Sequence, residues 1–475
     1  MQAGRRWILP LCLMVSCAPM VRAQGQEQTK QFAREIFKQL IEINTTDSVG
    51  NVTTAAEAMA KRLRDAGFAE GDVMVAGPND RKKNLVVRFH GTGKRKPILF
   101  IGHLDVVEAR REDWTTDPFE FLEKDGYFYG RGTEDMKEGD AILVANFIRL
   151  RKEGFFPDRD LIVALTADEE GGSSNGVDWL LKEHRGWIDA EYCINLDGGE
   201  FEKDKDKRLL AGIQASEKVY VDFQFKSLNA GGHSSIPSPD NAIYHLAGAL
   251  ARLQSFSFPV KINEITRNYF ERNAALTSGQ MAADLNAVSK QPPDNAAVQR
   301  LSANPYFNSL LHTTCVATML SGGHAPNALP QTARANVNCR IFPGEDPQEV
   351  RKTLERVAND PKVAVNFVAQ LGPDGKVTPV VAVPPSPLLP EVTQAMEKTL
   401  SVVWPGVPYV TTMSTGATDG KYTRIAGIPT YGISCMFFQR DDSRAHGKDE
   451  RVGVQDFYDG VDFNYKLIKE LSAPR

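Results

Sequence analysis

In the first two hundred residues, segments with hydrophobic residues at helical spacing alternate with short runs of consecutive hydrophobic residues. Apolar residues at helical spacing predict helices over residues 32–41, 55–66 and 140–153. Short apolar runs bounded by turn residues predict buried strands over residues 84–89, 97–102, 161–166 and 192–196. Because strands and helices interleave, the pattern predicts an α/β domain with a mostly parallel central sheet.

The pattern changes near residue 213. Residues 218–226 alternate, with Val219, Val221, Phe223 and Phe225 on one face, which predicts a strand in a sheet covered on one side. A helix over 241–253, a strand over 333–341 and a helix over 347–359 complete a small α+β domain of ferredoxin-like type, inserted in the larger one. Residues 255–311, polar and rich in Asn and Ala, are expected to be a partly helical insertion within it.

The larger domain resumes after a proline-dense linker at 379–390, with a helix over 391–403, a strand over 430–434 and a helix over 457–471. The expected domain organisation is therefore a signal peptide over 1–23, the first part of the large domain over 28–212, the inserted domain over 213–385, and the second part of the large domain over 386–475.

The first 23 residues have the features of a cleavable export signal. Arg5 and Arg6 precede an apolar stretch that is too short to span a membrane, and Val21-Arg22-Ala23 resembles a signal-peptidase site. We therefore expect an exported protein, periplasmic or secreted, with no stable membrane insertion after cleavage. Cleavage before Cys17, as in a bacterial lipoprotein, is the less favoured alternative, because Met14 is a poor first residue for that motif.

The charge and the cysteine spacing exclude some partners and some kinds of metal site. Lys and Arg number 56 against 60 Asp and Glu, a net charge of −4, and no basic stripe is present, so nucleic acid is not an expected partner. The six cysteines are scattered without a Cys-x-x-Cys pair, which argues against a thiolate zinc site and a dense disulfide framework. Any bound metal would therefore be held by histidine and carboxylate side chains.

Such side chains cluster where strands or glycine turns end. In open α/β sheets ligands bind beyond the carboxyl ends of the strands, so this placement is informative. The clusters contain His103 with Asp105, Asp135, Glu169 with Glu170, Asp197, and His446. Taken alone, each residue is more often a helix cap or a surface residue. Taken together, they suit catalytic zinc, and five ligands suit two ions that share one carboxylate.

In this order the clusters resemble the zinc-dependent exopeptidases and deacylases that include glutamate carboxypeptidase, aminoacylase, carnosine dipeptidase and succinyl-diaminopimelate desuccinylase. The resemblance covers about residues 28–472. It implies two Zn²⁺ ions per chain, with these roles: His103 and Asp197 bind one ion, Glu170 and His446 bind the other, Asp135 bridges them, Asp105 orients His103, and Glu169 is the general base.

The resemblance also implies that the inserted domain is a lid that can form a homodimer. Its His233, in Gly-Gly-His-Ser-Ser, would stabilise the transition state, often in the partner subunit's site. Asn327 and Arg340 would hold the substrate's terminal carboxylate. Two departures from the family pattern affect the shape of the site: Glu138 stands between Lys137 and Gly139, and the His446 segment reads His-Gly-Lys-Asp-Glu.

These features predict a dinuclear zinc hydrolase that cleaves an amide bond in small peptides or N-acyl amino acids. Carboxypeptidase or dipeptidase activity and N-acyl amino acid deacylation both remain open. A non-catalytic peptide-binding protein on the same fold is the alternative from another class. The intact Glu169 argues against it, because a protein that only binds has no need of a base that activates water.

Overall fold

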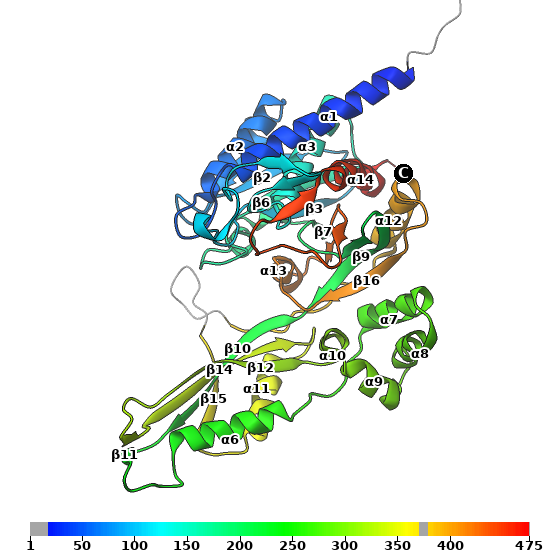
Figure 1. The fold of residues 1–475 in the computed structure, drawn as a ribbon. Coiled ribbons are helices and arrows are strands. Elements are labelled where there is room, and N and C mark those ends of the chain that lie inside the picture. Colours follow the sequence, from blue (N-terminus) through cyan, green and yellow to red (C-terminus); the bar gives the residue numbers. More distant parts are fainter. Residues whose placement is uncertain (1–17, 370–378, 475) are drawn as a thin grey trace, which may run out of the picture.

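The computed structural model describes residues 18–369 and 379–474. It shows a large domain and a small domain (Figure 1), and the chain passes into the small domain after β9 (Lys207–Glu217), which still belongs to the sheet of the large domain. Residues 1–17, most of the predicted signal peptide, lie outside the described residues. No helix in the described part of the chain is long and apolar enough to cross a membrane.

The large domain is built on a sheet of ten strands among the described residues. Its order is β1 (Val73–Ala76), β2 (Asn84–Phe89), β6 (Arg159–Thr166), β3 (Arg95–His103), β7 (Tyr192–Asn195), β17 (Thr430–Gly432), β9 (Lys207–Glu217), β8 (Phe201–Asp204) and β18 (Phe438–Gln439), and β16 (Tyr409–Ser414) also pairs with β9. The central strands β6, β3, β7 and β17 are parallel, and antiparallel pairs lie toward both sides. The predicted mostly parallel sheet is confirmed.

Helices cover both faces of this sheet, which explains why its strands read as continuous apolar runs. Leu85 and Val87 of β2 face a core shared with α1 (Ala18–Ile41), α2 (Val52–Asp65), α3 (Lys137–Lys152), α12 (Pro390–Val403) and α14 (Val454–Ser472). Val86, between them, faces a second cluster that includes residues of α4 (Gly176–Glu183) and α5 (Arg185–Ile188). The short α13 (Gly420–Ile425) contacts α4.

The small domain has a four-stranded antiparallel sheet in the order β12 (Thr314–Gly322), β14 (Thr332–Ile341), β10 (Val219–Leu228) and β15 (Val363–Phe367). Helices α6 (Ala242–Gln254) and α11 (Pro347–Ala358) pack on it around a core of its own. The chain order strand, helix, strand, strand, helix, strand gives the predicted ferredoxin-like arrangement. A disulfide joins Cys315 of β12 to Cys339, directly opposite on β14.

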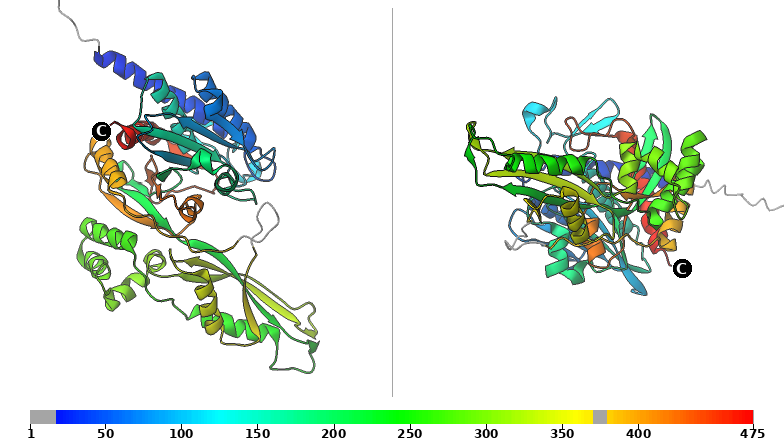
Figure 2. Two further views of the ribbon diagram at one scale, coloured as in Figure 1. Left: turned by 180° about the vertical axis from the view of Figure 1, so that it is seen from behind. Right: turned by 90° about the horizontal axis from the view of Figure 1, so that it is seen from below.

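The insertion between α6 and β12 contains four helices among its described residues: α7 (Glu264–Leu276), α8 (Gly279–Val288), α9 (Asn295–Ser302) and α10 (Pro305–Leu311). They enclose a core cluster that includes Phe270 and Leu301 and that extends to Val410 and Met413 of β16. The insertion therefore packs against the large domain. It lies at one end of the small domain, and β11 (Gly232–His233), which pairs with β13 (Ala328–Leu329), lies at the other (Figures 1 and 2).

A separate three-stranded sheet of β4 (Leu122–Lys124), β5 (Tyr127–Tyr129) and β19 (Arg451–Gly453) flanks the large domain. It connects two segments that are far apart in sequence, since β5 precedes the Asp135 loop and β19 follows the His446 loop. The pairing of Tyr129 with Arg451 therefore brings these two loops together.

Candidate metal centre

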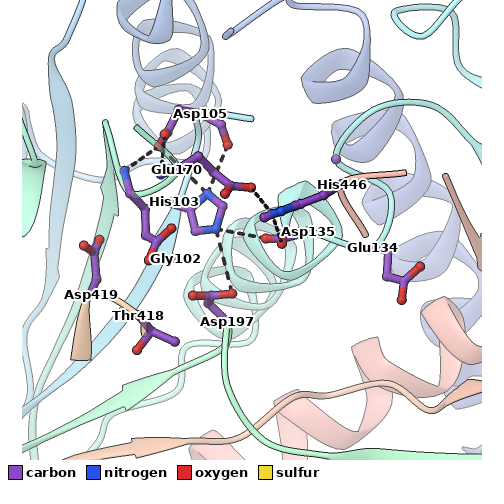
Figure 3. A network of polar contacts seen from close by, with 12 residues as sticks. Gly102, His103, Asp105, Glu134, Asp135, Glu170, Asp197, Thr418, Asp419 and His446 are labelled. Atoms are coloured by element: carbon purple, nitrogen blue, oxygen red, sulfur yellow. Dashed lines mark hydrogen bonds and ion pairs between the residues drawn. The ribbon is translucent and has the colours of Figure 1, made fainter. Parts of the chain in front are cut away.

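Three of the predicted ligands meet at the carboxyl ends of the parallel strands (Figure 3). His103 is the last residue of β3, Asp197 follows β7, and Asp135 lies in the loop before α3. Nε2 of His103 is 3.1 Å from Oδ1 of Asp135 and 3.8 Å from Oδ1 of Asp197. One potential ligand atom from each residue lies within 4.8 Å of the others, a spacing at which one ion can contact all three.

A second group shares Asp135. Nε2 of His446 is 3.0 Å from Oδ2 of Asp135 and 2.9 Å from Oε1 of Glu170, and these three ligand atoms also lie within 4.8 Å of one another. Asp135 thus directs one carboxylate oxygen to each group, as a bridging ligand requires. Each group combines one imidazole with carboxylates, the donor set of catalytic zinc sites, so the residues fit a pair of metal ions.

Asp105 contacts both sides of this cluster. Its backbone carbonyl lies 3.0 Å from Nδ1 of His103, whereas its carboxylate is 3.9 Å from that nitrogen. The carboxylate instead accepts the backbone N–H groups of Glu169 at 3.2 Å and Glu170 at 3.0 Å. Burial raises the pKa of Asp105 to about 6. The His103 ring is therefore oriented by the Asp105 backbone, and the Asp105 side chain fixes the Glu169–Glu170 turn.

The turn itself begins with an unusual backbone. Asp168 has φ of +59°, a left-handed conformation that is uncommon outside glycine, and sites with such conformations are often functional. Its carboxylate pairs with Lys82 and accepts the backbone N–H of Ser174. These contacts hold the strained residue at the end of β6, so that Glu169 and Glu170 project into the cluster beside it.

The electrostatics of the cluster favour a bound cation. Burial opposes protonation of His103, but hydrogen bonds to Asp135 and Asp197 outweigh it and raise the pKa of the imidazole well above its usual value. Hydrogen bonds to Asp135 and Glu170 raise the pKa of His446 to about 10. Burial raises the pKa of Asp197 to about 7. Positive charge is therefore stabilised at the position where the carboxylates converge.

Glu169 belongs to the same cluster without being placed in either ligand group. Burial, followed by the negative charge of Asp197, raises the pKa of its carboxyl group well above the usual value. A carboxyl group of raised pKa beside two metal positions can take a proton from water and pass it on. This is the chemistry expected of Glu169 from the sequence.

Glu450 organises the Asp135 loop, and sequence reasoning did not identify it. Its buried carboxylate pairs with Arg131 and accepts the backbone N–H groups of Gly132, Glu134 and Asp135. The sequence feature that could have identified it is its position as the last residue of the His-Gly-Lys-Asp-Glu segment. Glu450 thus couples the position of the shared ligand Asp135 to the loop that carries His446.

Asp419 lies beneath the cluster (Figure 3). It accepts a hydrogen bond from the hydroxyl of Thr166 at 3.0 Å and from the amide of Asn175 at 2.6 Å. The contacts show that it ties the end of β6 to the start of α13.

The small-domain candidates are not brought to the cluster. His233 is exposed on β11, hydrogen-bonded to Ser235 at 2.6 Å, and β11 lies at the end of the small domain far from the large domain (Figure 1). The backbone carbonyl of exposed Asn327 accepts the N–H of Ser234, so Asn327 lies near the same end. Arg340, on β14, stacks over the ring of Tyr220 at 4.7 Å. Within one chain these residues and the metal cluster form separate groups.

Comparison with known proteins places this arrangement in a family. Residues 99–470 match the model of peptidase family M20/M25/M40. The chain belongs to that family. The human N-fatty-acyl-amino acid synthase/hydrolase PM20D1 is 28% identical over 389 residues, covering 79% of this chain and 74% of the relative. Carboxypeptidase S of Saccharomyces cerevisiae is 32% identical over 266 residues, covering 52% of this chain and 45% of the relative.

Two solved structures share the fold. The M20 metallo-carboxypeptidase of Sulfolobus solfataricus superposes with a TM-score of 0.65 at 16% identity and covers 92% of this chain and 99% of its own. The dipeptidase Dug1p of Saccharomyces cerevisiae superposes with a TM-score of 0.63 at 16% identity. The match covers 96% of this chain and 99% of Dug1p. Membership of the M20/M25/M40 family makes this chain a hydrolytic metallopeptidase, with metal-dependent hydrolysis of an amide bond as its reaction.

Proposed function

We propose that this M20 chain is a dinuclear zinc exopeptidase of carboxypeptidase or dipeptidase type. The observation that carries the proposal is the pair of ligand groups that share Asp135, with Glu169 beside them. His103 and Asp197 would hold one Zn²⁺, and Glu170 and His446 the other. Bound there, the ions would acidify water and polarise the scissile carbonyl.

The residues of this chain then have defined tasks. Glu169 takes a proton from the attacking water and delivers it to the leaving nitrogen. Asp105 keeps Glu169 and Glu170 in place through their backbone N–H groups. Arg340, with its planar guanidinium, is suited to a bidentate contact with the free carboxylate of the substrate. His233 would donate to the oxyanion that develops on the cleaved carbonyl.

N-acyl amino acid hydrolysis is the second candidate. The similarity to PM20D1, 28% identity over 389 residues, favours it, because that relative is an N-fatty-acyl-amino acid synthase/hydrolase. Both candidates use the same centre and differ only in the acyl group that is accepted.

A homodimer would complete the site. His233 is on β11, which lies at the end of the small domain far from the large domain (Figure 1), so a second copy would be needed to supply that side chain. Strand β12 is an edge strand whose outward residues include the exposed Val316, Met319 and Leu320, and unpaired apolar edges favour pairing with another chain. We therefore propose a homodimer formed through β12 and α6, to be tested by sedimentation of the native chain and of Met319→Lys.

Export is proposed on two grounds. Residues 1–23 have the pattern of a signal peptide, and the Cys315–Cys339 disulfide suits an oxidising compartment. The mass of the mature chain, purified from its natural compartment, would identify the cleavage site and any lipid on Cys17.

The test of function is release of free amino acids from dipeptides and N-acyl amino acids, with zinc and after chelation, together with metal analysis. We expect two zinc ions per chain and turnover that chelator abolishes. Glu169→Gln should keep both ions and lose activity by about a thousandfold or more. Full activity of Glu169→Gln would refute the assigned base. A zinc-loaded native chain that turns over no substrate would favour the non-catalytic alternative.

A further inference from the structure

The two faces of the small-domain sheet differ in polarity. Every second residue of β10, from Val219 to Phe225, lies in the core that α6 and α11 cover. Successive side chains of a strand point to opposite faces, so Tyr220, Asp222 and Gln224 lie on the other face. Helix α6 lies on the side of the sheet away from the large domain (Figures 1 and 2). The polar face is therefore turned toward the domain that carries the metal ligands.

Arg340 lies on this polar face, directly opposite Tyr220 in the pairing of β14 with β10. Its guanidinium carbon is 4.7 Å from the centre of the Tyr220 ring. Among residues 18–369 and 379–474, none forms a hydrogen bond or an ion pair with the Arg340 side chain. Stacking uses the flat face of a guanidinium, whereas its N–H donors point outward from the edge. The donors of Arg340 are therefore available to a ligand.

Asp222 is a neighbouring carboxylate on this face, and other donors occupy it. The hydroxyl of Tyr220 donates to its Oδ2 at 2.7 Å, and the side-chain amides of Asn336 and Asn338 donate to its Oδ1 at 2.9 and 3.0 Å. Burial opposes the charge of Asp222, but these hydrogen bonds outweigh it and lower the pKa of the carboxyl group. Asp222 is thus an ionised acceptor that holds the Tyr220 ring, and it leaves the donors of Arg340 unoccupied.

We propose that Tyr220 is a positioning residue for substrate binding: its ring, held by Asp222, orients Arg340 for the free carboxylate of the leaving part. The inference rests on the proposed function, which assigns that carboxylate to Arg340. A long side chain loses conformational freedom when it binds a ligand, and a guanidinium that is already ordered by stacking loses less. The carboxylate can then accept two parallel N–H donors. Tyr220 thus contributes to the affinity for the carboxylate without contacting it.

The first test separates KM from kcat. Hydrolysis of alanyl-phenylalanine is measured with the zinc-loaded native chain and with Tyr220→Leu, which lacks the ring. We expect KM to rise by about tenfold, within the range for a contact between a guanidinium and an aromatic ring. The value of kcat should stay close to native, because the contact acts on ground-state and transition-state binding alike. Tyr220→Phe keeps the ring and should restore most of the affinity. Gln224→Leu, on the same strand and face, is the matched control and should retain the native KM.

The second test requires no turnover. Calorimetry with the zinc-loaded chain compares phenylalanine, the leaving part of that substrate, with phenylalaninamide, which has no carboxylate. Tyr220→Leu should weaken the binding of phenylalanine by about tenfold and leave the binding of phenylalaninamide unchanged. In an Arg340→Met background the same substitution should have no further effect, because Tyr220 acts through Arg340. A purely structural role of Tyr220 would weaken the binding of both ligands, in either background.

The outcomes distinguish this inference from the proposed function. Equal loss of both ligands, additive effects of the two substitutions, or an unchanged KM in Tyr220→Leu would overturn the inference and leave hydrolysis at the metal centre intact. Binding of phenylalanine that depends on Tyr220, in a native chain that hydrolyses no peptide or N-acyl amino acid, would refute the proposed function alone. Native affinity of Arg340→Met for phenylalanine would refute both the inference and the role proposed for Arg340.

Discussion

At the scale of single residues, the carboxylate of Asp105 does something different from what the sequence predicted. The spacing His103-x-Asp105 predicted a carboxylate that orients the imidazole. In the structure the backbone carbonyl of Asp105 contacts the ring, and the carboxylate accepts the N–H groups of Glu169 and Glu170. The residue therefore links the first ligand to the general base and to a ligand of the second group.

We predict that Asp105→Asn weakens metal binding. An amide offers one acceptor oxygen where the carboxylate offers two, so the N–H of Glu169 or Glu170 loses its partner. Substitutions that support metal ligands typically lower metal affinity by about 10–100-fold, and we expect that range here. Competition with a coloured chelator measures the zinc Kd. Asp178→Asn, on α4, is the control and should bind zinc as the native chain does; equal affinity of Asp105→Asn would contradict the role.

A buried lysine leads to a second prediction at this scale. Burial lowers the pKa of Lys218, at the start of the small domain, to about 7, and its ammonium donates to the carbonyl of His312. The unfolded chain retains the ordinary pKa of about 10.4. Between these values Lys218 binds more protons in the unfolded state, so its contribution to stability rises with pH, by up to about 1.4 kcal/mol per pH unit.

Lys218→Met should lower the slope of the unfolding free energy against pH by the contribution of Lys218, while the contributions of Lys137 and His446 remain. Urea unfolding at pH 7.5, 8.5 and 9.5, followed by far-ultraviolet circular dichroism, gives the slope for each chain. Lys218→Gln, which can still donate a hydrogen bond but does not titrate in this range, should show the same flattened slope even if its stability differs. Equal slopes in the native chain and in Lys218→Met over this interval would contradict the prediction.

At the scale of elements, the sequence predicted the strands that are buried on both faces and missed others. The parallel strands carry continuous apolar runs because helices cover both of their faces. Strand β12 was missed because it is an exposed edge strand with little apolar contrast. Strand β16 was missed because half of its residues are Thr and Ser, and one of them, Thr411, is buried where its hydroxyl bonds to α7 of the insertion.

Metal-ligand candidates could be predicted because each follows a strand or a turn directly, so their convergence needs only the parallel sheet. The separation of His233 from the metal cluster could not be predicted from the sequence, because it depends on how the two domains are arranged. Glu450 was missed for a similar reason. Its contacts with Gly132, Glu134 and Asp135 span more than 300 residues of sequence.

The disulfide between β12 and β14 gives a prediction at the scale of elements. Cys315 and Cys339 are 24 residues apart, and a link of that span stabilises a fold by about 3 kcal/mol through the unfolded state. Replacing both cysteines by alanine should therefore lower the unfolding free energy of the small domain by roughly that amount. Denaturant unfolding monitored by circular dichroism measures it. The buried free Cys193 provides the control variant Cys193→Ala, which removes a thiol from the other domain.

At the scale of the whole molecule, the two domains have separate cores, and only the large domain carries the metal ligands. All five tryptophans lie outside residues 213–385. Tryptophan fluorescence therefore reports on the large domain, whereas circular dichroism reports on both. This distribution allows the effect of metal on each domain to be measured in one intact chain.

We predict that zinc stabilises the large domain selectively. Without the ions, Asp135, Glu170 and Asp197 bring negative charges together, and a ligand that binds only the folded state adds about 4 kcal/mol at a thousand times its Kd. The fluorescence Tm should therefore rise by several degrees on adding zinc to the chelated chain. The small-domain transition seen by circular dichroism should move far less. The Cys315→Ala, Cys339→Ala double variant should show the opposite selectivity. The Tm of its small-domain transition should fall, while zinc should still raise its fluorescence Tm. Equal shifts of both transitions with zinc would instead mean that the packing of the insertion against β16 unites the domains into one cooperative unit.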